Sequence, residues 1–199
     1  MRTPLLACGL VVLLGCNRET APPPPATTAT GSSAQPAESA KPATTAKPAT
    51  EAAEVLVVGS AAPDFSVKAH DGTAIQPSAL KGRPIVLYFY PRDETPGCTK
   101  EACAFRDAWK DFEPTKVVLV GISTDTNESH KKFAENRKLP FHLVSDADGS
   151  IAGAYGVPNN AGFLARHTIV IGADGNVKKI YRSVDVSKHA AEVLADVKS

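Results

Sequence analysis

One segment of the chain reads Tyr88-Phe89-Tyr90-Pro91-Arg92-Asp93-Glu94-Thr95-Pro96-Gly97-Cys98-Thr99-Lys100-Glu101-Ala102-Cys103. Its apolar start is typical of a buried strand that stops at Pro91, and Cys98 follows where a helix is expected to begin. The free amide groups of a first helical turn and the positive end of the helix dipole stabilise a negatively charged sulfur. Thr95 lies three residues before Cys98 and carries a hydroxyl that can hydrogen-bond there. The segment therefore predicts a reactive thiolate at Cys98.

Short apolar or β-branched runs on both sides of this segment predict the strands of a sheet that is covered on both faces. These runs are residues 85–90, 117–123, 141–145 and 166–171. The turn residues 173–176 join the last of them to a partner strand at residues 177–181. Helical patterns lie between them, in the region after Cys98 that carries Ala102, Phe105, Trp109 and Phe112, and at residues 127–138, 150–155 and 186–198. The alternation of strands and helices predicts an α/β domain.

The first fifteen residues have the pattern of an export signal. Arg2 supplies one positive charge, and the apolar run from Leu5 to Leu14 is shorter than the roughly 20 residues that span a bilayer. Gly15 directly before Cys16 resembles the lipobox of bacterial lipoproteins, in which that cysteine is acylated and becomes the first residue of the mature chain. We therefore expect a lipoprotein signal peptide at residues 1–15 and an exported, membrane-anchored protein on the periplasmic or extracytoplasmic face. The alternative is an ordinary signal cleaved elsewhere, which would leave Cys16 as a free thiol.

The chain after Cys16 divides by composition. Residues 17–54 consist almost wholly of Ala, Pro, Thr, Ser, Lys and Glu and contain no aromatic side chain. Such a segment cannot bury a core, so we expect residues 16–54 to be a lipidated cysteine followed by a disordered tether. Residues 55–199 have the length of one domain with its own core.

Charge limits the class of partner. The 199 residues carry a formal net charge of +1, with 22 basic and 21 acidic side chains. Removal of Arg2 with the signal leaves 21 of each sign. This balance argues against nucleic acid or another polyanion as the partner.

The chain has four cysteines. Cys8 would leave with the signal and Cys16 would be acylated, so the domain keeps Cys98 and Cys103. A structural disulfide between these two is conceivable in an oxidising compartment, but closing so short a loop constrains the unfolded chain little. The pair therefore favours chemistry.

The pattern Pro91-x-x-x-Thr95-x-x-Cys98 resembles the signature of peroxiredoxins, and Thr-Pro-Gly-Cys-Thr-x-Glu-Ala-Cys resembles the subgroup called peroxiredoxin Q or bacterioferritin comigratory protein. Further matches follow along the whole domain: Gly59-x-x-Ala62-Pro63-Asp64-Phe65, Gly121-Ile122-Ser123, Leu139-Pro140-Phe141, Ser145-Asp146 and Ala154-Tyr155-Gly156-Val157. The resemblance implies a thioredoxin-like fold with a central mixed sheet and a thiol-dependent peroxidase that reduces hydrogen peroxide and organic hydroperoxides.

By this resemblance Cys98 is the peroxidatic cysteine, which becomes a sulfenic acid. Thr95 would hold the thiolate and orient the peroxide, and Pro91 would shield the sulfenic acid. Arg166, at the start of the strand 166–171, would stabilise the thiolate and polarise the O–O bond.

Cys103 would be the resolving cysteine, forming an intramolecular disulfide with Cys98. Five residues along a helix place two Cα atoms roughly 8 to 9 Å apart, whereas a disulfide tolerates no more than about 7 Å. The helix must therefore unwind around residues 98–106 in each cycle. Resolution within one chain makes a monomer sufficient, and export implies a thioredoxin-like dithiol donor outside the cytosol. We interpret Glu101 mainly as a stabiliser of the first helical turn.

Two other functions fit the same fold. A membrane-tethered thiol-disulfide oxidoreductase needs Cys-x-x-Cys, whereas this chain has four residues between its cysteines. A copper-binding assembly factor would use two cysteines and a histidine, and His167 stands near the expected position. Such factors use Cys-x-x-x-Cys, and the remaining histidines, His70, His130, His142 and His189, show no metal spacing with His167. We expect neither a metal nor a cofactor.

Overall fold

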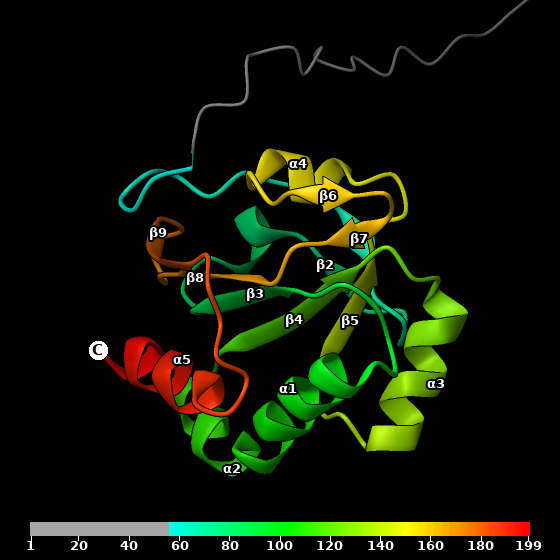
Figure 1. Ribbon diagram of the computed structural model, residues 1–199. Coiled ribbons are helices and arrows are strands. Elements are labelled where there is room, and N and C mark those ends of the chain that lie inside the picture. The colour runs from blue at the N-terminus through cyan, green and yellow to red at the C-terminus, as the bar shows by residue number, and fades with distance from the viewer. Residues whose placement is uncertain (1–55) are drawn as a thin grey trace, which may run out of the picture. The chain divides into compact units, whose positions relative to one another are not determined.

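The computed structural model describes residues 56–199 (Figure 1). The predicted signal peptide, the lipidation of Cys16 and the tether lie outside the described residues. Within residues 56–199, no helix is long and apolar enough to cross a membrane.

Nine strands and seven helical segments make up this region. The strands are β1 (Val67–Lys68), β2 (Ala74–Ile75), β3 (Ile85–Phe89), β4 (Val118–Ser123), β5 (His142–Ser145), β6 (Asn159–Asn160), β7 (Phe163–Leu164), β8 (His167–Ile171) and β9 (Val177–Tyr181). The α-helices are α1 (Pro96–Asp107), α2 (Trp109–Phe112), α3 (Asn127–Arg137), α4 (Ser150–Ala154) and α5 (His189–Lys198). Two short 3₁₀ helices, η1 (Pro77–Leu80) and η2 (Glu113–Thr115), complete the set.

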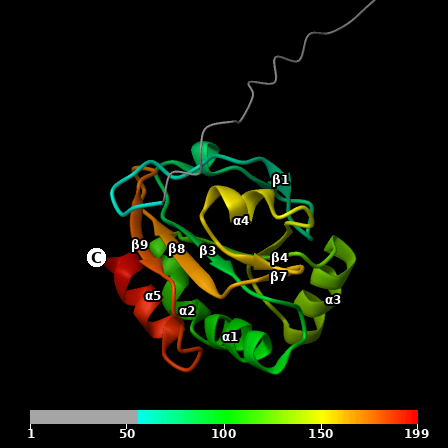
Figure 2. The ribbon, with the colours of Figure 1, turned by 45° about the horizontal axis from the view of Figure 1, so that its top comes forward.

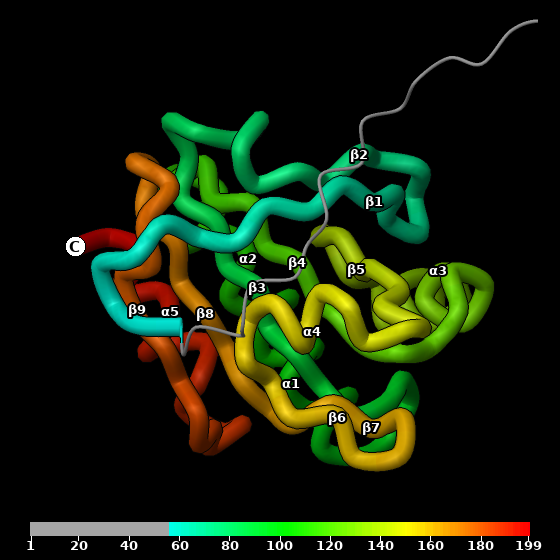
Figure 3. Tube along the Cα trace, turned by 90° about the horizontal axis from the view of Figure 1, so that it is seen from above, coloured from blue at the N-terminus to red at the C-terminus, as the bar shows by residue number. Residues whose placement is uncertain are grey.

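The central sheet has the strand order β5-β4-β3-β8-β9, which Figure 3 shows from right to left. The middle strand β3 pairs in parallel with β4 and antiparallel with β8, so the sheet is mixed as expected. In this register Phe89 lies opposite His167, which brings the residue before β8 beside the loop that follows β3. The candidate site lies at this end of β3, where the chain leaves the sheet and leads into α1.

Alternation along β3 divides the core into two layers. Leu87 and its neighbours on one face join a cluster covered by the β1–β2 hairpin and α4. Tyr88 and its neighbours on the other face join a cluster that includes Cys98 and side chains of α1, α3 and α5. Figure 1 and Figure 2 show these two coverings on opposite sides of the sheet. Burial of each large apolar side chain contributes about 1.5–3 kcal/mol, so the sheet is held from both sides.

The packing of β3 against β4 depends on one glycine. Tyr88 pairs with Gly121, and a Cβ atom added at Gly121 would lie 2.6 Å from the Tyr88 ring. No side chain fits at that distance. Gly121 therefore lets a large aromatic residue lie over the sheet beside α1.

The observed elements differ from the predicted ones in three places. The helix after Cys98 is interrupted at Ala108, whose ψ of 3° leaves the helical range, and α2 begins at Trp109. The final helix begins at His189 instead of residue 186, because residues 186–188 form a turn bound to Asp185. The short hairpins β1–β2 and β6–β7 were not predicted, since two-residue strands leave no apolar period.

Candidate active site

Cys98 lies in the first turn of α1, on the face that packs against the sheet. Thr95 is the N-cap residue, and Pro96 occupies the first helical position, where its fixed φ and missing N–H cost nothing. Only 2% of Cys98 is exposed. The sulfur is thus held at a helix start in nearly dry surroundings, where opposite charge acts strongly.

The required cation is Arg166. It directly precedes β8, and its Nη2 donates a hydrogen bond to the Cys98 sulfur at 3.1 Å. The side chain of Arg166 is 20% exposed, so solvent screens this contact only partly. The structure therefore brings together Cys98 and Arg166, two predicted site residues that are 68 positions apart.

Glu101 is placed differently from our interpretation. It does not stabilise the first turn of α1, because the helix begins at Pro96 and its first turn holds no acidic residue. Only 1% of Glu101 is exposed, and it accepts a hydrogen bond from Arg166 Nη1. Burial raises the pKa of Glu101 to about 7, although the charge of Arg166 opposes the shift. The correction has a simple cause, because the third residue after Cys98 on a helix points to the same buried side.

His189 of α5 lies behind this ion pair. Its Nε2 is 2.8 Å from the Thr168 hydroxyl and 3.9 Å from Glu101 Oε1. Burial lowers the pKa of His189 to about 4, and the nearby Arg166 charge acts in the same direction. His189 is therefore neutral at physiological pH. In the described region Glu101 Oε1 has no hydrogen-bond partner.

Thr95 and Pro91 line the loop before α1, and both are half-buried. The Thr95 hydroxyl donates to the backbone carbonyl of Arg92 at 3.1 Å. In this state its proton is directed to the loop and not to the Cys98 sulfur. The predicted roles of Thr95 and Pro91 toward peroxide and sulfenic acid stay predictions.

A second buried carboxylate, Asp93, lies in the same loop and was not predicted. It accepts hydrogen bonds from the Tyr90 and Ser129 hydroxyls, both at 2.7 Å, and its Oδ2 lies 3.0 Å from His130 Nδ1. Burial opposes ionisation, yet the bonds from His130, Tyr90 and Ser129 lower the pKa of Asp93. One signal was present in the sequence: His130 is three residues before Phe133, on the buried side of α3.

Cys103 lies further along α1 and is half-buried. Both Cys98 and Cys103 are free thiols in this structure. They belong to one continuous helix, so the separation expected from helix geometry applies. Unwinding around residues 98–106 stays a prediction.

The surroundings of His167 do not favour the alternative of a copper site. It is nearly buried in β8, and burial lowers its pKa. In the part of the chain that the structure describes, no group of three or more His, Cys, Asp or Glu side chains is arranged to hold a metal ion.

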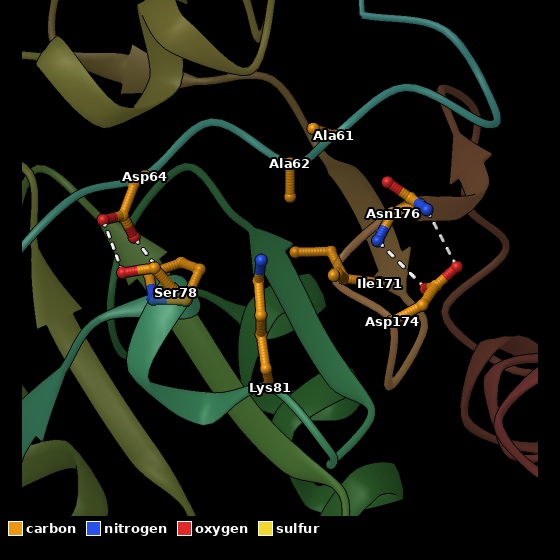
Figure 4. A pocket seen from close by; sticks show the side chains of 10 residues that line it. Ala61, Ala62, Asp64, Ser78, Lys81, Ile171, Asp174 and Asn176 are labelled. Atoms are coloured by element: carbon orange, nitrogen blue, oxygen red, sulfur yellow. Dashed lines mark hydrogen bonds between the residues drawn. The ribbon is translucent and has the colours of Figure 1, made fainter.

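A small cavity of about 130 Å³ lies elsewhere (Figure 4). Its polar groups are largely paired with one another: Ser78 bonds Asp64 and Asn176 bonds Asp174, while Lys81 extends into the space between them. It is lined by Ile171 at the far end of β8, about 16 Å along the strand from Arg166. This cavity is not part of the thiol site.

Comparison with known proteins agrees with this geometry. The model of the AhpC/TSA family matches residues 58–180. The chain belongs to this family. Peroxiredoxin Q of rice (Oryza sativa subsp. japonica) is 46% identical over 144 residues, which cover 71% of this chain. The match spans 66% of the rice protein, just under two thirds of its length. A putative peroxiredoxin bcp of Coxiella burnetii is 40% identical, over 69% of this chain and 95% of that protein.

Solved structures of AhpC/TSA proteins have the same fold. Peroxidoxin BcpB of Mycobacterium tuberculosis superposes with a TM-score of 0.67 at 39% identity, covering 72% of this chain and 97% of that one. The bacterioferritin comigratory protein of Xanthomonas campestris gives 0.65 at 33% identity, over 72% and 96%. The predicted thioredoxin-like α/β fold is confirmed, and the chain falls in the peroxiredoxin Q and bacterioferritin comigratory protein group.

Proposed function

We propose that the protein is a thiol-dependent peroxidase that uses Cys98 as its nucleophile. The observation that carries the proposal is the hydrogen bond of 3.1 Å from Arg166 to the sulfur of a buried cysteine at a helix start. The thiolate attacks the terminal oxygen of a hydroperoxide and gives two electrons to the O–O bond, which breaks. The products are Cys98 sulfenic acid and a hydroxide or alkoxide, which takes a proton from solvent. Arg166 stabilises the charge before and during this step.

The second step is resolution by Cys103. Its thiol attacks the sulfenic sulfur, an S–S bond replaces the S–O bond, and water leaves with the thiol proton. The half-buried position of Cys103 on the same helix supports resolution within one chain, for which a monomer is sufficient. A thioredoxin-like dithiol then reduces the disulfide and is itself oxidised.

The substrates that we propose are hydrogen peroxide and organic hydroperoxides. The bacterioferritin comigratory protein of Xanthomonas campestris has alkyl peroxide reduction activity. At 33% identity its chemistry supports a similar substrate class here.

The location that we propose is the periplasmic or extracytoplasmic face of a bacterial membrane, with the protein anchored through lipidated Cys16. The support is the sequence of residues 1–16 alone. The reductant is then a membrane-relayed or extracytoplasmic dithiol. Palmitate labelling of the full chain should be lost in Cys16→Ala, and a water-soluble mature protein would contradict the anchor.

Turnover of four proteins tests the catalytic proposal. With hydrogen peroxide, an organic hydroperoxide and a dithiol reductant, Cys98→Ser should have no activity. Arg166→Gln should lower the rate with peroxide about 10²- to 10³-fold, because one preorganised charge is lost. Cys103→Ser should consume one equivalent of peroxide and then stall as the sulfenic acid. Activity of Cys98→Ser at the wild-type rate would refute the proposal.

A further inference from the structure

The loop before Cys98 is bound to α3 far more firmly than a surface loop needs to be. Asp93 accepts bonds from Ser129 and Tyr90 and faces His130, and its own N–H donates to Asp125 at 2.8 Å. His130 is fully buried and the Asp93 side chain is 4% exposed. Such buried charged bonds are costly to break. The loop 91–95 is therefore fixed to the beginning of α3.

α1 is bound to the other end of the same helix. Arg106 Nη1 donates to the backbone carbonyl of Arg137, the last residue of α3, at 2.8 Å. Figure 1 and Figure 2 both show α1 and α3 side by side. The residues between these two attachments, 96–105, contain both Cys98 and Cys103. We call residues 96–105 the opening segment.

We propose that Asp93 and Arg106 are positioning residues that bind the two ends of the opening segment to α3, so that α1 unwinds between them while the loop 91–95 stays in place. The inference rests on the proposed function, because only disulfide formation requires the opening. Its consequence is mechanical. Cys103 moves toward Cys98, whereas Pro91 and Thr95 keep their places in the loop before α1 throughout the cycle.

The geometry favours this division of the segment. Within residues 96–105, the side chain of Glu101 has a hydrogen-bond partner on only one oxygen. Asp93, outside the segment, has partners on both oxygens. The inner part of the segment can therefore be released at lower cost than its upstream end.

Hydrogen exchange of the full-length protein tests the inference. The Cys98–Cys103 disulfide is made with diamide, which takes two electrons and two protons from the thiol pair, so no peroxidase activity is needed. In the wild type, amides of residues 97–105 should exchange faster after oxidation, while those of residues 92–95 and of β4 stay unchanged, Pro91 and Pro96 having no backbone N–H. Equal exchange of residues 96–105 in the two states would overturn the proposal.

Two variants should shift the upstream and the downstream end of the opening segment independently. His130→Phe keeps a buried ring but removes a partner of Asp93, so exchange at 91–95 in the oxidised protein should rise at least about tenfold. Arg106→Gln should leave 91–95 unchanged and raise exchange at residues 106–112. A merely structural loss of stability would raise exchange at both ends and in β4, and this result would overturn the proposal.

Glu94→Gln is the matched control. Glu94 belongs to the same loop and also bonds α3, through Asn136 and Arg137, but its side chain is 38% exposed. Exchange at 91–95 should stay within about twofold of the wild type, because exposed ion pairs contribute little. An effect as large as that of His130→Phe would overturn the role of the buried attachment. If His130→Phe does not fold, Ser129→Ala removes one bond to Asp93 and must show the same upstream shift.

Peroxide consumption by the reduced wild-type protein tests the peroxidase function separately from the positioning role of Asp93 and Arg106. Loss of this activity together with the expected exchange pattern would refute the peroxidase alone. Normal activity together with a loop 91–95 that opens in the oxidised wild type would refute the positioning role alone.

Discussion

Two buried carboxylates flank the reactive sulfur, and they are held in different ways. Asp93 precedes Cys98 by five residues and receives hydrogen bonds on both oxygens, from Tyr90, Ser129 and His130. Glu101 follows Cys98 by three residues and is bonded on one oxygen only, by Arg166. The pKa of Asp93 is lowered, whereas burial raises that of Glu101 to about 7. The charged form of Asp93 is thus stabilised in the loop that we propose stays fixed. Glu101 has fewer hydrogen bonds, and it lies in the helix that we propose opens.

The largest expected effect is on stability, through Asp93. Asp93→Ala leaves His130 and the Tyr90 hydroxyl buried without their acceptor, so the free energy of unfolding at pH 7 should fall by about 3–5 kcal/mol. Denaturant unfolding of the reduced protein measures this. Ser129→Ala, which removes one donor, is the control and should cost about 1–2 kcal/mol. If the two losses were equal, the buried carboxylate would not be the centre of the attachment.

The second effect is a pH dependence of stability that is specific to Glu101. Its folded pKa of about 7 lies above the ordinary 4.5, so the folded state binds more protons than the unfolded state between these values. The contribution of Glu101 to stability is complete below about pH 4.5 and is lost as the pH rises to about 7. The loss amounts to about 3 kcal/mol. The difference in unfolding free energy between wild type and Glu101→Gln should shrink by this amount over the same range.

Asp93→Asn is the control for this measurement, because its expected sign is opposite. The folded pKa of Asp93 is lowered below the ordinary 3.8. Its contribution is therefore present above about pH 3.8 and is lost as the pH falls through the folded value. If the unfolding free energy of Glu101→Gln changed with pH as steeply as that of the wild type between pH 4.5 and 7, the pKa of Glu101 in the folded protein would not be raised.

The sequence was enough to predict the sheet and half of the site. Four of the five long strands were predicted from short apolar or β-branched runs and the fifth, β9, from the turn before it, and all their ends were predicted to within one residue. Cys98 and Arg166 were paired through a family signature, and the register of Phe89 with His167 explains why they meet.

The flanking carboxylates were not predicted, and the reason is physical. A glutamate near the start of a helix has the same local pattern whether it faces water or the core, and Glu101 faces the core, where it meets Arg166 from 65 residues away. Asp93 likewise depends on His130 and Ser129, 37 and 36 positions away. Local patterns predicted the faces of helices, but not which polar partners tertiary packing brings together.

The smallest expected effect concerns Glu94, which separates burial from the number of bonds. Glu94 accepts hydrogen bonds from two residues, Asn136 and Arg137, although its side chain is exposed. Its backbone has a φ of 57°, in the left-handed region. Glu94→Ala loses the exposed pair and keeps the left-handed backbone, so unfolding should cost up to about 1 kcal/mol less. Glu94→Gly loses the same ion pair, but glycine adopts the left-handed backbone without strain, which adds about 1–2 kcal/mol to the free energy of unfolding. The greater freedom of glycine in the unfolded chain takes back part of this gain.

The two Glu94 variants should therefore differ from each other more than the glycine variant differs from the wild type. Thermal or denaturant unfolding should place Glu94→Gly within about 0.5 kcal/mol of the wild type and Glu94→Ala below it. Because both variants lack the side-chain bonds, their difference reports the backbone alone. If both lost several kcal/mol, as Asp93→Ala should, then the number of bonds to α3 would matter more than their burial, and the contrast between the fixed loop and the opening helix would need another cause.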